Sequence, residues 1–256
     1  MNHQPMHPLT GLTVIARSLL LGLSMLTSAC AEQPASNTSA SQPPAPPSAL
    51  VASVGIAESP ATAQPSLSFS EWREQFRSEA LAQGISAQTF DQAFAGITPD
   101  PTVLRADSSQ PEFTRPIWEY LQSATSDSRV RNGQAKLLEQ QDSLAAIQQQ
   151  YGVEAPYLVA VWGMESSYGQ FMGEQSVIRS LATLAYAGRR QQFAHSQLLA
   201  ALQILQHGDI PATNMRGSWA GAMGQTQFIP TTYNSHAVDF DGDGRRDIWN
   251  SSADAL

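Results

Sequence analysis

The chain has a single cysteine, Cys30, among its 256 residues, so no disulfide can form within it. It is also short of basic residues: 14 Lys and Arg stand against 22 Asp and Glu, which gives a formal net charge of −8 at pH 7. Proteins that bind DNA or RNA need a basic surface to neutralise phosphates. The composition therefore argues against a nucleic-acid partner.

The patterns of several other enzyme classes are missing too. The glycine-rich stretch 217–230 lacks the Lys-Ser/Thr ending of a phosphate-binding loop, which argues against a nucleotide. His195, His207 and His236 have no metal-ligand spacing, and there is no Ser-His-Asp or Cys-His pattern. We interpret these histidines as ordinary polar residues.

The apolar run near the N-terminus is too short for a comfortable membrane span. It covers residues 19–26, follows Arg17 in a segment without acidic residues, and leads through small residues to Cys30. This arrangement is typical of a secretory signal and resembles the signal of bacterial lipoproteins, in which the cysteine becomes the lipidated first residue. We predict a lipoprotein signal peptide over 1–29 and lipidation at Cys30. The alternative is an incidental thiol in a cleaved signal.

The segment that follows Cys30 has almost no residues that could build a core. Residues 31–66 contain seven prolines, no aromatic residue, and only Glu32 and Glu58 as charges. Such a segment buries too little surface to offset the entropy lost on ordering. We predict a disordered tether over 30–66 and a folded domain over 67–256.

The folded part is predicted to be mainly helical, because apolar residues recur at helical spacing between capping residues and glycines. Prolines 99, 101 and 111 favour an extended connector between the second and third helices. The predicted helices begin at Ser70, Ser86 and Pro116 and then cover about 128–151, 156–169, 180–186 and 191–206.

Glu165 lies near the end of an apolar helix that Pro156 can open and Gly169 can close. On a helix it shares a face with Leu158, Val161 and Trp162, and it lies near the negative end of the helix dipole. Both effects disfavour ionisation, so the carboxyl group is expected to keep the proton that a general acid needs. The alternative is a helix-end glutamate that faces water.

The stretch 217–230 has small and amide-bearing residues beside aromatics, and its glycines at 217, 221 and 224 allow a ligand to approach the backbone. These residue types suit a sugar. The alternative is that the glycines serve close helix packing.

A cation-binding loop is predicted over residues 239–250. Asp239, Asp241, Asp243 and Asp247 occupy loop positions 1, 3, 5 and 9 of an EF-hand, and Arg245 offers its carbonyl at position 7. Asn250 stands where a bidentate Glu is expected, so Asp254 is the candidate to close the site. A structural Ca²⁺ or Na⁺ is expected, with an acidic turn that binds no metal as the alternative.

Four ordered runs carry a resemblance to a known family: GMESSYG, AGRRQQFAH, GSWAGAMGQTQFIP and AVDFDGDGRRDIW, within residues 163–249. They resemble the lytic murein transglycosylase B family of membrane-bound bacterial enzymes. The resemblance implies a mainly α fold of the α+β lysozyme-like superfamily with a glycan-binding groove. It also implies cleavage between N-acetylmuramic acid (MurNAc) and N-acetylglucosamine (GlcNAc) without water, which leaves a 1,6-anhydro-MurNAc end.

The resemblance also implies site residues and a location. Glu165 would be the catalytic residue, with Ser218, Gln227 and Tyr168 as sugar contacts. Arg189 and Arg190 would lie along the groove, although a pair of arginines at a helix entry is also typical of a solvated surface. The implied location is the periplasmic face of the outer membrane, with peptidoglycan and other cell-wall enzymes as partners. Relatives continue beyond Leu256, so a domain truncated at its C-terminus is expected.

The motifs offer one carboxylate outside the cation loop, whereas ordinary glycosidases use two. One is enough if the substrate supplies the attacking oxygen and Glu165 acts first as acid and then as base. No cofactor is then needed for catalysis. A hydrolytic muramidase is the nearest alternative, and a non-catalytic lipoprotein that binds peptidoglycan or calcium is the other.

Overall fold

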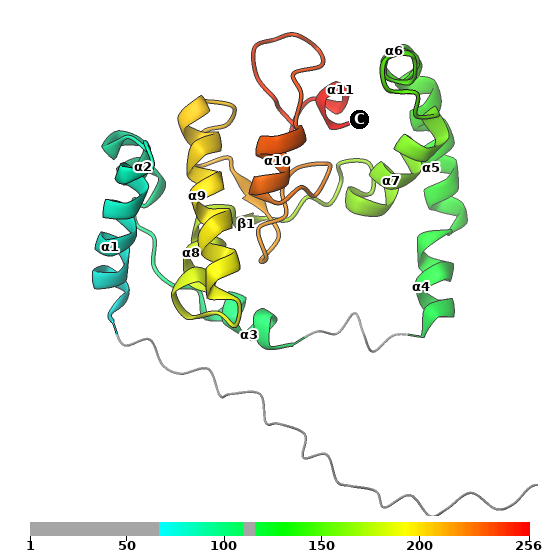
Figure 1. Ribbon diagram of the computed structural model, residues 1–256. Coiled ribbons are helices and arrows are strands. Elements are labelled where there is room, and N and C mark those ends of the chain that lie inside the picture. The colour runs from blue at the N-terminus through cyan, green and yellow to red at the C-terminus, as the bar shows by residue number, and fades with distance from the viewer. Residues whose placement is uncertain (1–66, 110–115) are drawn as a thin grey trace, which may run out of the picture. The chain divides into compact units, whose positions relative to one another are not determined.

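The computed structural model describes residues 67–109 and 116–256 (Figure 1). The predicted signal peptide, tether and lipidation site Cys30 lie outside these residues. No helix in the described part is long and apolar enough to cross a membrane. The described residues form these helices and strands: α1 Phe69–Ala82, α2 Ala87–Ala93, α3 Pro101–Ser108, α4 Ile117–Ala124, α5 Asp127–Glu139, α6 Gln141–Tyr151, α7 Ala155–Ser166, β1 Gln175–Ser176, α8 Val177–Ala187, α9 Gln191–His207, β2 Arg216–Gly217, α10 Pro230–His236 and α11 Ser252–Ala255.

The core is built around α9. Helix α8 packs along it, and Figure 1 shows α2 and α10 on opposite sides of it. Leucines at 181, 198 and 202 are fully buried there, and the stacked rings of Phe90 and Phe94 join them from α2. Burial of large apolar side chains is the main favourable term in folding, so this cluster is the principal source of stability.

Helix α1 begins two residues earlier than predicted. Ser68, not Ser70, is the N-cap: its Oγ accepts a hydrogen bond from the Glu71 amide at 3.3 Å, and its own amide donates to Glu71 Oε2 at 2.8 Å. This reciprocal pair is a capping box, which needs a Glu three residues after the cap. Ser68 has that Glu, which decides between the two serines.

The predicted extended connector is wrong, because α3 forms within it. Pro101 occupies the first turn, where its missing N–H costs nothing, and the Asp100 carboxylate caps the helix by accepting from the Thr102 amide at 2.8 Å. Asp100 also pairs with Arg179 of α8 at 3.2 Å. The proline that suggested extended chain in fact starts a helix.

The single helix predicted over 128–151 is two helices, α5 and α6, which meet at Gln140 (φ −103°, ψ 16°). Both pack against α7. A straight helix over that range would be about 36 Å long, twice the length of about 18 Å for α7, so it could not follow α7 along its whole length. The break lets both helices reach the same short partner.

The stretch 217–230 is not helical but folds into a tight series of bridges. Strand β2 pairs antiparallel with β1, with Gln175 opposite Gly217, and two isolated bridges join Gly217 to Met223 and Met223 to Phe228. A Cβ at Gly217 would lie 2.1 Å from the Ala222 carbonyl oxygen, so only glycine fits there. We call residues 217–230 the glycine-rich loop.

Candidate functional site

Helix α7 places Glu165 in its last turn. The helix ends at Ser166, because Ser167 (φ 50°) and Tyr168 (φ 63°) adopt left-handed conformations. The Ser167 amide bonds to the Gly163 carbonyl at 3.2 Å and the Tyr168 amide to the Trp162 carbonyl at 3.3 Å, a Schellman-type ending. The predicted stop at Gly169 is therefore two residues late, but the predicted position of Glu165 at the helix end is confirmed.

Glu165 lines a cavity of about 220 Å³ between α7, the glycine-rich loop and α11. Leu158, Val161 and Trp162 line the same cavity, which confirms the face predicted for them. Among the described residues of its wall, Glu165 is the only acid. The other lining residues are Val153, Tyr157, Gln225, Thr226, Phe228, Ala255 and Leu256.

The expected burial of Glu165 is wrong, because its side chain is exposed. Helix α7 is apolar on nearly every side, so its sequence pattern did not show which face packs. Trp162 and Val159 face the core, whereas Val161 and Met164 are at least half exposed. The face that carries Glu165 is thus the open wall of the cavity.

Gln225 joins the glycine-rich loop to α7 and is 5% exposed. Its Oε1 accepts a hydrogen bond from the Trp162 indole Nε1 at 3.0 Å, and its carbonyl oxygen accepts one from Ser166 Oγ at 2.7 Å. These two α7 residues flank Glu165 in the helix. Gln225 was not among the predicted site residues, since nothing in the sequence distinguished it from the nearby Gln227.

Tyr168 lies outside the cavity. It is 8% exposed, its ring meets Trp162 edge-on at 5.6 Å, and its hydroxyl donates to the Arg129 carbonyl of α5 at 2.8 Å. Burial raises the pKa of this phenol above its usual value. Tyr168 therefore ties α5 to α7 and does not line the cavity at Glu165.

Ser218 and Gln227 are partly exposed residues of the glycine-rich loop, and neither lines the cavity at Glu165. Ser218 Oγ accepts hydrogen bonds from the Ala220 amide at 3.3 Å and the Ala222 amide at 3.0 Å. Gln227 has a left-handed backbone (φ 52°) and donates through Nε2 to the carbonyls of Met172 and Gly224. Both side chains shape the loop itself.

Arg189 and Arg190 are exposed and precede α9. The Arg190 guanidinium lies 4.9 Å from the centre of the Phe193 ring and, with Trp219, lines a small hollow beside the glycine-rich loop. The Arg189 amide donates to Asp107 Oδ2 at 2.7 Å. The structure thus brings Arg190 close to the loop but not into the cavity that Glu165 lines.

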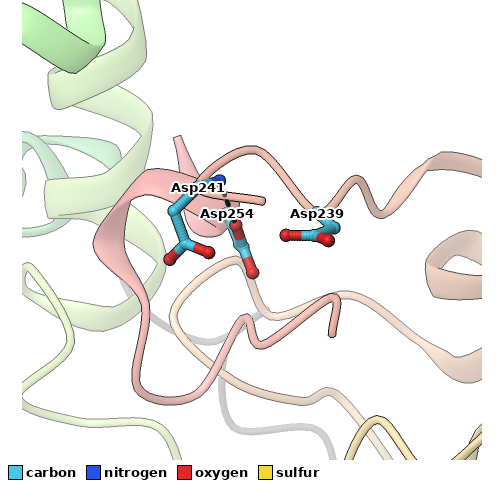
Figure 2. Close-up of side chains that lie close together, drawn as sticks. All are labelled: Asp239, Asp241 and Asp254. Carbon is cyan, nitrogen blue, oxygen red and sulfur yellow. Dashed lines mark hydrogen bonds between the residues drawn. The ribbon is translucent and has the colours of Figure 1, made fainter. Parts of the chain in front are cut away.

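Three carboxylates meet at the predicted cation loop. Figure 2 shows Asp239 and Asp241 on the loop, with Asp254 of α11 close to both. One oxygen from each lies within 4.8 Å of the others. Oxygens that surround one Ca²⁺ at 2.3 to 2.6 Å have separations of about this size or less, so the three fit a calcium ion. Burial raises the pKa of Asp254 above its usual value.

Two predicted carboxylate ligands lie outside this group. The Asp247 carboxylate accepts hydrogen bonds from the amides of Trp249 and Asn250 at 3.0 and 2.9 Å, so it caps the turn after the loop. Asp243 pairs with the Arg245 side chain at 3.3 Å. Asp254 lies where its predicted closing role requires, whereas Asp243 and Asp247 lie outside the group of three carboxylates.

A second cavity, of about 350 Å³, adjoins the first, and the two share Val153, Leu158, Thr226, Phe228, Ala255 and Leu256 in their walls. Asp254 lines this second cavity. Glu165 therefore lines the first of two adjoining cavities, and Asp254 lines the second.

Comparisons with known proteins identify the family and the fold. A family model described as the transglycosylase SLT domain matches residues 68–256. SltB3 from Pseudomonas aeruginosa, solved in complex with NAG-anhNAM-pentapeptide, is 65% identical, with a TM-score of 0.72 over 73% of this chain and 50% of that chain. The mainly helical, lysozyme-like fold is thus confirmed.

Two more distant relatives come from Escherichia coli. Membrane-bound lytic murein transglycosylase B of strain K12 is 33% identical over 132 residues, which cover 51% of this chain and 37% of the relative. The lytic transglycosylase Slt35, solved in complex with calcium, is 29% identical, with a TM-score of 0.65 over 72% of this chain and 59% of that chain. The chain therefore spans about half the length of the solved relatives and less of the curated one.

Proposed function

The chain belongs to the transglycosylase SLT domain family, as its motifs predicted. We therefore propose that it is a peptidoglycan lytic transglycosylase, which cleaves the β-1,4 bond between MurNAc and GlcNAc. The product would be a 1,6-anhydro-MurNAc end. The observation that carries the proposal is the lone carboxylate, Glu165, in the wall of a cleft formed with the glycine-rich loop.

The chemistry needs only this one acid. Glu165 gives its proton to the glycosidic oxygen as the bond from C1 to that oxygen breaks, and the N-acetyl group or the cleft supports the positive charge at C1. The Glu165 carboxylate then takes the proton of the C6 hydroxyl as O6 bonds to C1. Glu165 regains its proton, no water is consumed, and no metal or other cofactor takes part.

The exposure of Glu165 in the free protein fits this scheme if the substrate itself encloses the acid. A glycan strand laid along the apolar wall of Leu158, Val161 and Phe228 would displace water from around the carboxylate. Removal of water disfavours the ionised form, so the proton would be retained when substrate is bound. The exclusion of water that we expected from the helix alone would then come from the bound substrate.

Contacts beyond Glu165 are proposed from the loop geometry. Ser218 accepts two amide hydrogen bonds, which leaves its hydroxyl proton free to donate to an N-acetyl carbonyl. Gln227 donates through Nε2 to the backbone, so its Oε1 is the atom suited to accept from a sugar. Arg190 and Arg189, exposed beside the loop, would meet stem-peptide carboxylates.

The relatives support peptidoglycan as the substrate class. SltB3 was solved with NAG-anhNAM-pentapeptide and with NAG-NAM-pentapeptide, which contain an anhydro sugar in one case and an ordinary one in the other. The resemblance to the membrane-bound E. coli relative supports a location in the cell envelope. We extend this to a lipid anchor at Cys30 on the periplasmic face of the outer membrane. Palmitate labelling that Cys30→Ala leaves unchanged would overturn the anchor.

A calcium ion is proposed at Asp239, Asp241 and Asp254, with Na⁺ as the alternative ion. The supporting observations are the spacing of the three carboxylates and the calcium complex of Slt35. Its role would be structural, because a full shell of oxygen ligands offers no open position for chemistry.

Digestion of purified sacculi, followed by mass spectrometry, tests the function. The wild-type protein should release anhydro-muropeptides, and Glu165→Gln should abolish that release because the amide cannot donate a proton as an acid. Glu154→Gln is the matched control: it lies at the other end of α7, makes no side-chain capping bond, and should leave release unchanged.

The same spectra separate the rival functions. A hydrolytic muramidase would give products heavier by one water. A protein that sediments with sacculi but releases nothing would be a non-catalytic binder. Undiminished release of anhydro products by Glu165→Gln would remove Glu165 from the mechanism.

A further inference from the structure

We propose that Gln225 is a positioning residue that fixes the last turn of α7, and with it Glu165, against the glycine-rich loop. Its catalytic consequence rests on the proposed transglycosylase function, but its structural basis does not. Gln225 would not touch the reacting atoms and would act only through α7.

Both polar atoms of the Gln225 side chain make hydrogen bonds. Oε1 accepts from the indole Nε1 of Trp162 at 3.0 Å, and Nε2 donates to the Trp249 carbonyl at 3.4 Å. Gln225 and Trp162 are 5% and 4% exposed, so water does not compete for these bonds. A buried amide with both ends bonded has one favourable orientation, and it fixes its partners accordingly.

The main chain of Gln225 holds the residue next to Glu165. Ser166 Oγ donates to the Gln225 carbonyl at 2.7 Å and accepts from the Gly169 amide at 3.0 Å. Ser166 directly follows Glu165 and is 1% exposed. Gln225 therefore contacts the residue three before Glu165 through its side chain and the residue after it through its backbone.

The backbone of Gln225 is itself held by a hydrogen bond to the buried core. Its amide donates to the Ile248 carbonyl at 2.9 Å, and Ile248 is fully buried. A Cβ on Gly169 would lie 2.8 Å from Gln225 Oε1, so the amide also packs closely against the chain that leaves α7. The loop is thus a fixed support for the helix end.

The helix end needs such a support. Ser167 and Tyr168 both have positive φ without being glycine, a conformation that costs energy and persists only where the surroundings impose it. The bonds from Gln225 act on the residues that lead into this bend. Without them, the last turn could relax and move the Glu165 carboxylate away from the cleft.

The chain offers a matched control for a purely structural glutamine. Gln197 on α9 is 3% exposed, and its Oε1 accepts from the Thr231 amide and the Thr231 hydroxyl, both at 3.1 Å. It has the same chemistry and burial as Gln225, but its partner lies at the start of α10 and not on α7. Gln197→Leu should cost stability without moving Glu165.

The experiment compares Gln225→Leu, Gln197→Leu and wild-type full chain in thermal unfolding, in kcat and KM for release of anhydro-muropeptides, and in hydrogen exchange of residues 162–169. Both variants should lower Tm. Only Gln225→Leu should lower kcat per folded molecule, by about ten- to a hundredfold with little change in KM, because a displacement of about 1 Å can cost about a hundredfold. Only Gln225→Leu should speed exchange in residues 162–169. Ser166→Ala removes the bond to the Gln225 carbonyl together with the bond from the Gly169 amide. It should show the same pattern more weakly and serves if Gln225→Leu does not fold.

Each other result has a definite meaning. Unchanged kcat and unchanged exchange in residues 162–169 in Gln225→Leu, or in Ser166→Ala if Gln225→Leu does not fold, would overturn the proposal. An equal loss of kcat in Gln197→Leu would also overturn it, since the effect would then be general destabilisation. If the wild-type protein releases no anhydro product, the proposed function fails, and hydrogen exchange alone decides whether Gln225 holds the end of α7.

Discussion

The ring of Tyr168 packs so closely on Gly163 that a Cβ at Gly163 would lie 2.5 Å from the tyrosine hydroxyl oxygen and 2.6 Å from Cζ. A Cβ at Gly133 of α5 would lie 2.7 Å from the same oxygen. Tyr168 is therefore held between two glycines on two helices. The hydroxyl reaches the Arg129 carbonyl because neither helix has a side chain in its path.

Gly163→Ala should destabilise the protein by about 1 to 3 kcal/mol, the usual cost of overpacking a core. Alanine is the better helix former by about 1 kcal/mol, so a net loss can come only from the clash with Tyr168. Urea unfolding measures the change. Ala160→Gly, at an exposed position of the same helix, should change the free energy of unfolding only through the difference in helix propensity. A more stable Gly163→Ala protein would contradict the packing described here.

Calcium should raise the thermal unfolding temperature, because a ligand that binds only the folded state stabilises it by about 2.7 kcal/mol at a hundred times its Kd. Asp254→Asn should remove most of this shift, since Asp254 is the proposed ligand that would join α11 to the loop. The measurement is thermal unfolding with chelator, with Ca²⁺ and with Na⁺.

Asp91→Asn is the control for the calcium series. Asp91 is an exposed acid that pairs with Arg77 at 3.0 Å, well away from the cation loop in sequence, so its variant should keep the full shift. A shift that survives in Asp254→Asn, or that Na⁺ produces equally well, would argue against a calcium site.

Asp100 should make stability depend on pH at acid values. Hydrogen bonds from the Thr102 hydroxyl and amide, with the Arg179 charge nearby, hold the pKa of Asp100 below its ordinary value of 3.8. A folded-state pKa below the unfolded one stabilises the protein above the unfolded value, and this stability is lost as pH falls through the folded value. Asp100→Asn should therefore be less stable than wild type at pH 7, and the difference should shrink below about pH 4. Urea unfolding between pH 7 and pH 3 measures it, and a constant difference would contradict the assignment.

Removal of one partner of the ion pair between Asp209 and Arg246 should lower the stability of the protein. The two lie 2.6 Å apart with side chains 8% and 21% exposed, and the guanidinium lies over the Tyr233 ring. Asp209→Asn should cost about 3 kcal/mol, because it leaves a largely buried charge unpaired. The double variant with Arg246→Met should recover part of the loss in urea unfolding. A double variant that loses more stability than the two single variants lose together would contradict this expectation.

Most helices were predictable, because their caps and apolar spacing are local properties of the chain. Ser86, Gly152 and Gly208 end or begin helices as expected. The errors arose where a partner decides: α5 and α6 separate because both must reach α7, and α3 forms because Asp100 can cap it.

The site was predictable as a set of segments but not as contacts. Glu165 and the glycine-rich loop do lie together, and Asp254 does join Asp239 and Asp241. The choice of Gln225 over Gln227 for contact with α7 depends on bridges through Met223 that orient the loop. No periodicity in the sequence records which of two amides faces a helix whose contacting residue, Trp162, lies 63 residues earlier in the chain.

The ladder between β1 and β2, the bond from Gln227 to the Met172 carbonyl and the contacts of Gln225 all link the glycine-rich loop to α7 or to the chain that leaves it. Two sides of the cavity at Glu165 are therefore joined to each other by hydrogen bonds. Any change of width has to come from the remaining side, where Ala255 and Leu256 follow Asp254. Under the proposed function, tolerance for thicker or cross-linked glycan strands would be a property of α11 and of the contacts that hold it.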